Sequence, residues 1–160
     1  MKSQLFYSAF FLFVFLLIFL PPYLASINNY ILSEIAYGVF SRLCHQLSER
    51  SFTLWDSKLG VCARCVGIYF GLLFGCVFYR LINPKGAIPT RWILLASVAP
   101  LFFDGVTQFI GLRESTNLLR FITGFLFGVV FPTYLIPATD AALANYMHCQ
   151  NLGRTRKGRK

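Results

Sequence analysis

The sequence predicts an all-α integral membrane protein, a helical bundle of about four transmembrane helices plus one interfacial amphipathic helix. Three observations lead to this prediction. The 160 residues are 56% hydrophobic and 13% charged, whereas soluble domains are about 25% charged. Long stretches carry no charge at all, and glycines recur every four residues in two of them. The length allows one small bundle and no second soluble domain.

The first expected span, Leu5–Leu20, carries no charge. Pro21 and Pro22 interrupt it, and its continuation to Ala25 reaches the ~20 residues that cross a bilayer. A cleaved signal peptide is the alternative, because small residues follow the break. We favour a retained anchor, since the apolar run is long for a signal sequence. Residues 1–26 are therefore predicted to form an N-terminal transmembrane anchor.

Residues 27–43 have an amphipathic pattern. Apolar side chains recur every four residues from Ile27 to Leu43, with polar and charged side chains on the other face. This pattern predicts a helix that lies at the membrane interface or against the bundle. It delivers Cys44 at its C-terminal end. Residues 46–61 are mostly polar and form the longest predicted loop.

The second span is expected from about Ala63 to Ile82, where turn residues end it. Gly67, Gly71 and Gly75 recur every four residues along this span. A row of small residues at this spacing lets another helix approach closely.

Two more spans complete the predicted membrane core, residues 27–138. The third is Trp92–Ile110, with a proline inside it. The fourth begins after Ser115, a good N-cap, and runs to about Ile136 with a second face of small residues. The tail, residues 139–160, is predicted to be a surface helix with a basic end that touches anionic lipid.

The charge distribution predicts an orientation. The net charge of +9 lies in short loops and the tail, with no nucleic-acid-reading module, so we expect a lipid bilayer and no nucleic acid as partner. The 26–62 loop is nearly balanced in charge, whereas the 80–91 loop and the tail are basic. We therefore expect a multi-pass protein of the cell (plasma or inner) membrane with both termini cytoplasmic. The cysteine loop then faces outward, where disulfides are permitted.

Chemistry-bearing side chains concentrate between residues 44 and 65. Cys44, His45, Cys62 and Cys65 offer three thiolates and one imidazole, a donor set that suits tetrahedral zinc. A thiol–disulfide oxidoreductase that uses Cys62 and Cys65 is an alternative, because a helix N-terminus and Arg64 both lower a thiol pKa. A third reading is a disulfide from Cys44 that only clamps the loop.

A second polar cluster lies in the third and fourth spans. Asp104 and Gln108 share one face of the third span, and Asn117 and Arg120 lie one turn apart on the fourth. In an antiparallel hairpin centred near Leu112, Asp104 and Arg120 reach the same depth, so we expect them to form an ion pair. A pair that only fixes helix register is the alternative.

Both polar clusters are predicted to face the outer side, which indicates a shared pocket for an anionic lipid or a small ligand. Arginine suits bidentate contact with phosphate. No nucleotide-binding loop, HExxH or GxSxG motif is present, and the sequence assigns no catalytic residue. The candidate ligand-binding residues are Arg50, Arg64, Asp104, Gln108, Arg113, Asn117 and Arg120.

The strings C-H-Q-x-x-x-R-S-F at 44–52 and C-A-R-C-V-G-I-Y-F-G at 62–71 resemble an uncharacterised prokaryotic membrane-protein family, domain of unknown function two-zero-eight-five. The strings D-G-V-T-Q at 104–108 and R-E-S-T-N-L-L-R-F-I-T-G at 113–124 fit the same family. The resemblance implies a small multi-span membrane protein with no established activity. The spacing of polar residues and glycines in the third and fourth spans is also weakly similar to that of VanZ-like membrane proteins.

Overall fold

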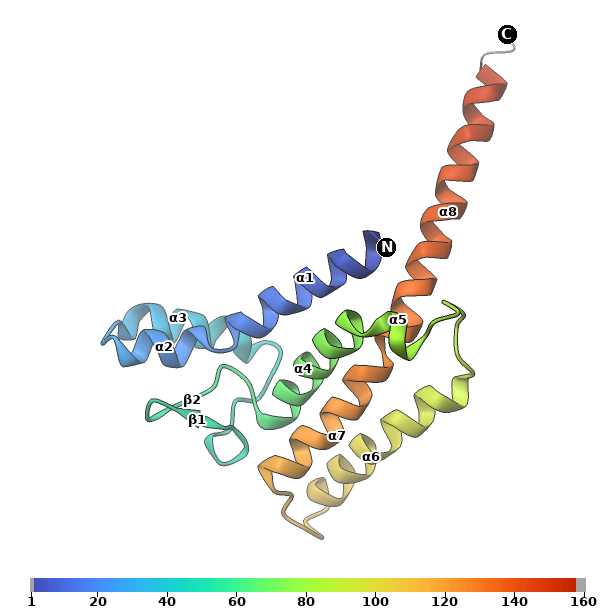
Figure 1. Ribbon diagram of the computed structural model, residues 1–160. Helices are drawn as coiled ribbons and strands as arrows, with labels where there is room; N and C mark the ends of the chain where they lie inside the picture. The colour runs from blue at the N-terminus through green and yellow to red at the C-terminus, as the bar shows by residue number, and fades with distance from the viewer. Residues whose placement is uncertain (1, 158–160) are drawn as a thin grey trace.

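The computed structural model describes residues 2–157, and these are helical almost throughout (Figure 1). The all-α prediction is confirmed, because the sheet found in this range is a single two-stranded hairpin. The elements are α1 (Lys2–Leu17), α2 (Leu20–Ser26), α3 (Tyr30–Ser41), the 3-10 helix η1 (Ser48–Arg50), β1 (Thr53–Leu54), β2 (Ser57–Lys58), α4 (Ala63–Val77), α5 (Tyr79–Ile82), α6 (Arg91–Phe109), α7 (Asn117–Val130) and α8 (Pro132–Lys157).

Within residues 2–157, three helical stretches are long and apolar enough to cross a membrane. They are Ser3–Ser26, which joins α1 and α2, Arg91–Phe109, which is α6, and Asn117–Gln150, which joins α7 and α8. Pro21 lies in the first turn of α2, where a missing backbone N–H breaks no helical hydrogen bond. These stretches agree with three of the predicted spans.

The predicted span from Ala63 to Ile82 is divided at Phe78 into α4 and α5. The 15 residues of α4 extend about 22 Å at the helical rise of 1.5 Å per residue. This length is less than the ~30 Å hydrocarbon core of a bilayer. The count of four spans therefore stays a prediction, and α4 lies at the centre of the bundle, between α1 and α7.

The two predicted faces of small residues pack against each other, and α4 and α7 are the most extensively packed pair of helices (Figure 1). A Cβ added to Gly71 would lie 2.5 Å from the carbonyl oxygen of Phe125, and one on Gly75 would lie 2.6 Å from that of Val129. On α7, a Cβ added to Gly124 would collide with the carbonyl oxygen of Arg64 in α4. The glycines thus set the register between these helices, and α6 packs against α7.

The start of α7 differs from the prediction by one residue. Thr116 is the N-cap, and its Oγ1 accepts a hydrogen bond from the backbone N–H of Leu119 at 3.3 Å. Ser115, the predicted cap, is buried in the preceding loop. After α7, α8 extends away from the other helices (Figure 1). Helix α8 continues through Lys157, and Arg159 and Lys160 at the end of the predicted basic tail lie outside the described residues.

Helix α3 turns its apolar side chains outward. Ile31, Ile35 and Val39 are 78%, 59% and 63% exposed. Ser33, on the opposite face, is buried and donates a hydrogen bond to the carbonyl oxygen of Pro21 at 2.9 Å, which joins α3 to α2. An exposed apolar stripe on a helix is typical of contact with lipid, as predicted for an interfacial helix.

Candidate functional site

A buried glutamine fixes the loop that follows Cys44. The Nε2 atom of Gln46 donates hydrogen bonds to the carbonyl oxygens of Tyr37, at 2.9 Å, and Gly60, at 2.7 Å. The backbone of Gln46 is left-handed, with φ of 50°, and its carbonyl oxygen accepts a hydrogen bond from Lys58 Nζ at 2.8 Å. These contacts hold the end of α3 against the segment that leads into α4.

The rest of the predicted loop folds into η1 and a tight hairpin. Thr53 pairs with Lys58 in an antiparallel register. Trp55 and Asp56 occupy the turn, with φ of 50° and 58°, the signs of a two-residue type I′ turn. Asp56 is exposed at this tip, so it lies on the hairpin and takes no part in the cysteine group described next.

Cys44, Cys62 and Cys65 form a cysteine triad. Their sulfur atoms all lie within 4.8 Å of one another. Cys62 is the N-cap of α4 and Cys65 lies in its first turn. Cys44 comes from the end of α3, and its Sγ accepts a hydrogen bond from the backbone N–H of Cys62 at 3.2 Å. All five cysteines are free, so the clamping disulfide considered from the sequence is not formed.

The triad is packed on one side by apolar side chains. Cys44 is buried in a core cluster with Ile18, Phe40 and Val61, whereas Cys62 and Cys65 are half-buried. Hydrogen bonds from the thiols of Cys62 and Cys65 hold the pKa of Cys44 well below its usual range. The same bond to Cys44 raises the pKa of Cys62. The three sulfurs therefore act on one another as one hydrogen-bonded group.

The geometry of the triad fits one metal ion. Thiolates bound to tetrahedral zinc at ~2.3 Å stand about 3.8 Å apart, and the three sulfurs are already within 4.8 Å of one another. His45, the fourth ligand predicted from the sequence, is exposed and lies outside this group. Because Cys44 is directed into the core, its neighbour in the chain faces away.

Asp104 pairs with Arg64 of α4, and the predicted Asp104–Arg120 pair is not formed. Arg64 Nη2 donates to Asp104 Oδ2, and Arg113 Nη2 lies 3.7 Å from Asp104 Oδ1. The reason is the close contact of α4 with α7, which brings the Arg64 backbone against Gly124. From there the Arg64 side chain reaches α6 at the level of Asp104, which is 4% exposed.

Arg120 is almost completely buried, with 6% of its surface exposed. Its Nη1 donates a hydrogen bond to Asn117 Oδ1 at 2.7 Å. Asn117 Nδ2 in turn donates to the carbonyl oxygen of Ser51 at 3.3 Å, which joins α7 to the segment after η1. The Nε atom of Arg120 is buried and has no hydrogen-bond partner among the residues that the structure describes.

A polar cavity of about 240 Å³ opens beside Arg120. Of the predicted ligand-binding residues, it is lined by Arg50, Gln108, Arg113 and Arg120. Arg64 and Asp104 form their ion pair beside it, and Asn117 orients Arg120. The triad does not line this cavity, so the two predicted clusters are separate sites.

Sequence reasoning missed several residues that shape these sites. Glu49, Glu114 and Ser115 also line the polar cavity. Gln46 holds the loop at the triad, and the sequence gives no sign of its left-handed backbone. Arg64 was itself a candidate residue, but its ion pair with Asp104 was not predicted.

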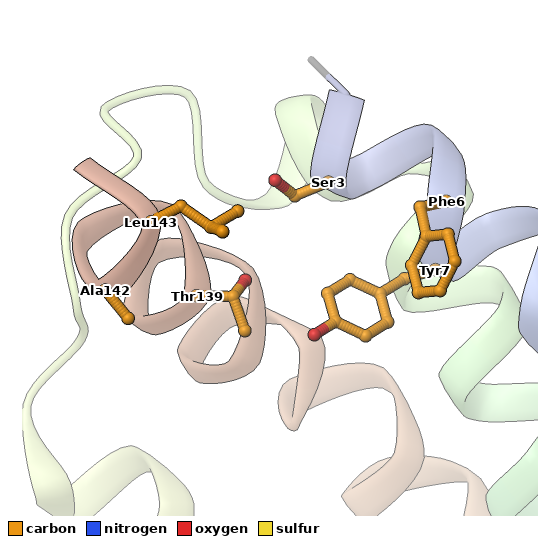
Figure 2. Close-up of a pocket in the computed structure, with 6 residues that line it drawn as sticks. All are labelled: Ser3, Phe6, Tyr7, Thr139, Ala142 and Leu143. Atoms are coloured by element: carbon orange, nitrogen blue, oxygen red, sulfur yellow. The ribbon is translucent and has the colours of Figure 1, made fainter. Parts of the chain in front are cut away.

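A larger cavity of about 450 Å³ lies between α1 and α8 (Figure 2). Its lining is mainly apolar, with Phe6 and Tyr7 of α1 facing Thr139 and Leu143 of α8 (Figure 2). Ser3 donates a hydrogen bond to Asp140 near this cavity. The apolar lining offers no catalytic or metal-binding group, so we assign no chemistry to it.

The chain matches a protein family described as "Predicted membrane protein (DUF2085)" over residues 44–134. The chain belongs to this family. An uncharacterized protein of Methanocaldococcus jannaschii is 45% identical over 134 residues, which cover 79% of this chain and 86% of that protein. An uncharacterized protein of Methanothermobacter thermautotrophicus is 41% identical over 90 residues, 56% of this chain and 81% of that protein.

No solved structure matches the chain. The comparisons give no support to the VanZ-like similarity. The range matched by the family contains the triad, the Arg64–Asp104 pair and Arg120. The comparisons therefore establish a membrane-protein family without an assigned activity.

Proposed function

We propose that this DUF2085 protein binds one divalent metal ion, best zinc, through the triad of Cys44, Cys62 and Cys65. The observation that supports this proposal is that three sulfurs from two separate segments lie within 4.8 Å of one another. Thiolate ligands select zinc over magnesium, calcium and manganese. The half-buried Cys62 and Cys65 leave the ion a side that is open to a further ligand.

The metal has a structural consequence for the loop. Cys44 follows α3, whereas Cys62 and Cys65 belong to the start of α4. One ion would therefore join the interfacial helix to the bundle core. Because the ligands must be brought together for the ion to bind, binding free energy stabilises the folded loop.

Three protein ligands leave the fourth tetrahedral position to water or to a small external ligand. Structural zinc sites normally use four protein ligands, whereas sites that bind a reactive water or a substrate use three. The triad belongs to the second type by ligand count. We propose no reaction for it, and any enzymatic activity stays open.

The proposal is tested by the metal content of the purified full chain. Protein extracted in detergent under reducing conditions is expected to carry about one zinc per chain, measured by plasma mass spectrometry. Cys44→Ser, Cys62→Ser and Cys65→Ser should each lose the metal. Cys76→Ser and Cys149→Ser are matched controls, because these thiols lie outside the triad, and His45→Ala should keep its zinc.

Absence of zinc, nickel, cobalt and copper from the wild-type protein would sink the proposal. The thiol–disulfide oxidoreductase that uses Cys62 and Cys65 is the second candidate, and it is supported by the three sulfurs that lie within 4.8 Å of one another. It predicts a metal-free protein in which a disulfide within the triad forms in membranes. When quinones, the two-electron oxidant, are depleted from the cell, the cysteines should stay as thiols.

We also propose that the protein lies in the cell membrane with both termini cytoplasmic and the cysteine loop outside. The basic 80–91 loop supports this orientation. We expect a membrane-impermeant maleimide to label an Asp56→Cys variant in intact cells. Cys149, which is exposed in α8, should react only after the membrane is permeabilised. The reverse labelling pattern would contradict the orientation.

A further inference from the structure

Beyond the metal site, we propose that the polar cavity beside Arg120 binds a phosphate group, either free or as a lipid headgroup. The cavity has a volume of about 240 Å³. Arginines reach it from three separate segments: Arg50 from η1, Arg113 from the α6–α7 loop and Arg120 from α7. Guanidinium groups that converge from separate elements match the several oxygens of a phosphate.

Arg120 lacks a counter-charge of its own. It is 6% exposed, and its one side-chain hydrogen bond within the described part of the chain goes to the neutral amide of Asn117. The nearby carboxylate of Asp104 accepts a hydrogen bond from Arg64 through Oδ2, and Arg113 Nη2 lies 3.7 Å from its Oδ1. A buried charge without a partner is costly. An anion in the cavity would provide this partner and an acceptor for the free Nε.

Uncharged donors complete the cavity. Gln108 of α6 and Ser115 of the α6–α7 loop both line it, and Ser115 is buried. An amide and a hydroxyl can donate hydrogen bonds to phosphate oxygens that the arginines do not reach. The lining therefore contains more donors than a merely structural arginine needs.

Two glutamates set a limit on the ligand. Glu49 and Glu114 also line the cavity, and both are exposed. Neither forms an ion pair within the described residues. Their two negative charges offset part of the charge of the three arginines, which disfavours a ligand with several phosphate groups. The lining thus favours a phosphate of low charge.

The position of the cavity agrees with a ligand at the membrane surface. Gln108 ends α6, and Arg120 belongs to the first turns of α7. Helix α6, and α7 together with α8, are long and apolar enough to span a bilayer. The cavity at their common end therefore lies near the level of lipid headgroups. A headgroup could enter it laterally, and free phosphate could enter it from water.

The test is ligand-dependent thermal stabilisation of the full chain in detergent. Inorganic phosphate is compared with chloride at equal ionic strength, and dioleoyl phosphatidic acid with dioleoyl phosphatidylcholine in mixed micelles. We expect phosphate or phosphatidic acid to raise the unfolding temperature of the wild type, with an apparent affinity that Arg50→Gln and Arg113→Gln each weaken about tenfold. Stabilisation by phosphatidic acid alone identifies a lipid ligand. Stabilisation by phosphate alone identifies a free anion. Either result supports the proposal.

The control variants separate a local effect from general loss of charge. Arg42→Gln removes an exposed arginine at the end of α3, and it should leave the affinity unchanged. Arg120→Gln should abolish the response and Arg120→Lys should weaken it; if either fails to fold, the two exposed variants still decide. A wild-type protein that responds equally to phosphate and chloride, and to both lipids, overturns the proposal, as does an equal loss in Arg42→Gln.

Discussion

The cysteine triad and the arginine cavity lie at the same polar end of the bundle, yet they are built differently. The triad gathers three sulfurs within 4.8 Å of one another, and apolar side chains pack behind Cys44. The cavity contains a buried guanidinium whose Nε has no partner among the described residues. The triad thus offers electron-pair donors to a cation, whereas the cavity offers hydrogen-bond donors and positive charge to an anion.

The largest expected effect comes from breaking the contact that positions both sites. A Cβ on Gly124 would meet the backbone carbonyl oxygen of Arg64, and neither helix can move away without losing the interface. We expect Gly124→Val to cost about 3 kcal/mol or more, with loss of the monodisperse species in size-exclusion chromatography. Gly38→Val is the control, because a Cβ there has no neighbour within 4 Å. Equal behaviour of the two variants would contradict the proposed packing.

The next effect comes from breaking the Arg64–Asp104 ion pair, neither member of which lines the cavity. Arg64→Met leaves the buried Asp104 without its main partner, although Arg113 stays 3.7 Å away, so the free energy of unfolding should fall by about 3 kcal/mol, the lower end for a broken buried pair. The double variant Arg64→Met with Asp104→Leu should recover most of this loss, since no charge is then left alone. Denaturant unfolding in detergent provides the measurement. A double variant as unstable as the single one would show that the pair itself supplies the stability.

A smaller effect should change metal binding at the triad and leave the arginine cavity unchanged. Gln46→Leu leaves two backbone carbonyl oxygens, of Tyr37 and Gly60, without their donor, at a cost of about 1–3 kcal/mol. We expect weaker zinc retention in a competition assay with a chelator. The phosphate response should not change, because Gln46 does not line the cavity. A parallel loss of both responses would mean that the two sites act as one.

The smallest effect comes from stabilising the β1–β2 hairpin between the two cysteine segments. Asp56 has φ of 58° in the turn, a backbone conformation that glycine adopts without strain. Asp56→Gly should therefore stabilise the fold by about 0.5 kcal/mol. Thermal unfolding of the metal-loaded protein measures it. A lower unfolding temperature than the wild type would argue that the Asp56 side chain has a role of its own.

The fold was largely predictable because lipid imposes strong rules on a sequence. Uncharged runs marked the apolar helices, and the spacing of glycines marked the two faces that meet between α4 and α7. The division of the second span at Phe78 was not predictable, because its flanking residues are all helix-compatible and apolar. The one-residue shift of the cap from Ser115 to Thr116 lies within the freedom that two adjacent hydroxyl residues allow.

The sequence predicted most residues of the two sites, but it did not predict which of these residues contact one another. Cysteine spacing pointed to Cys44, Cys62 and Cys65, but the direction of His45 depends on the turn at Gln46. Counting residues along the hairpin of α6 and α7 matched Asp104 with Arg120. This count ignored α4, which packs against α7 and carries Arg64. The register between α4 and α7 is a tertiary property, and it decided that Arg64 is the partner.

The short length of α4 has a consequence for hydrophobic matching. A helix of about 22 Å cannot reach both surfaces of a hydrocarbon core of ~30 Å. If the C-terminal end of α4 lies at one membrane surface, its first turn, with Cys62 and Cys65, lies below the headgroups of the other. Bilayers of longer acyl chains would then deepen this position, so membrane thickness would control how easily a metal ion or a reductant reaches the three sulfurs.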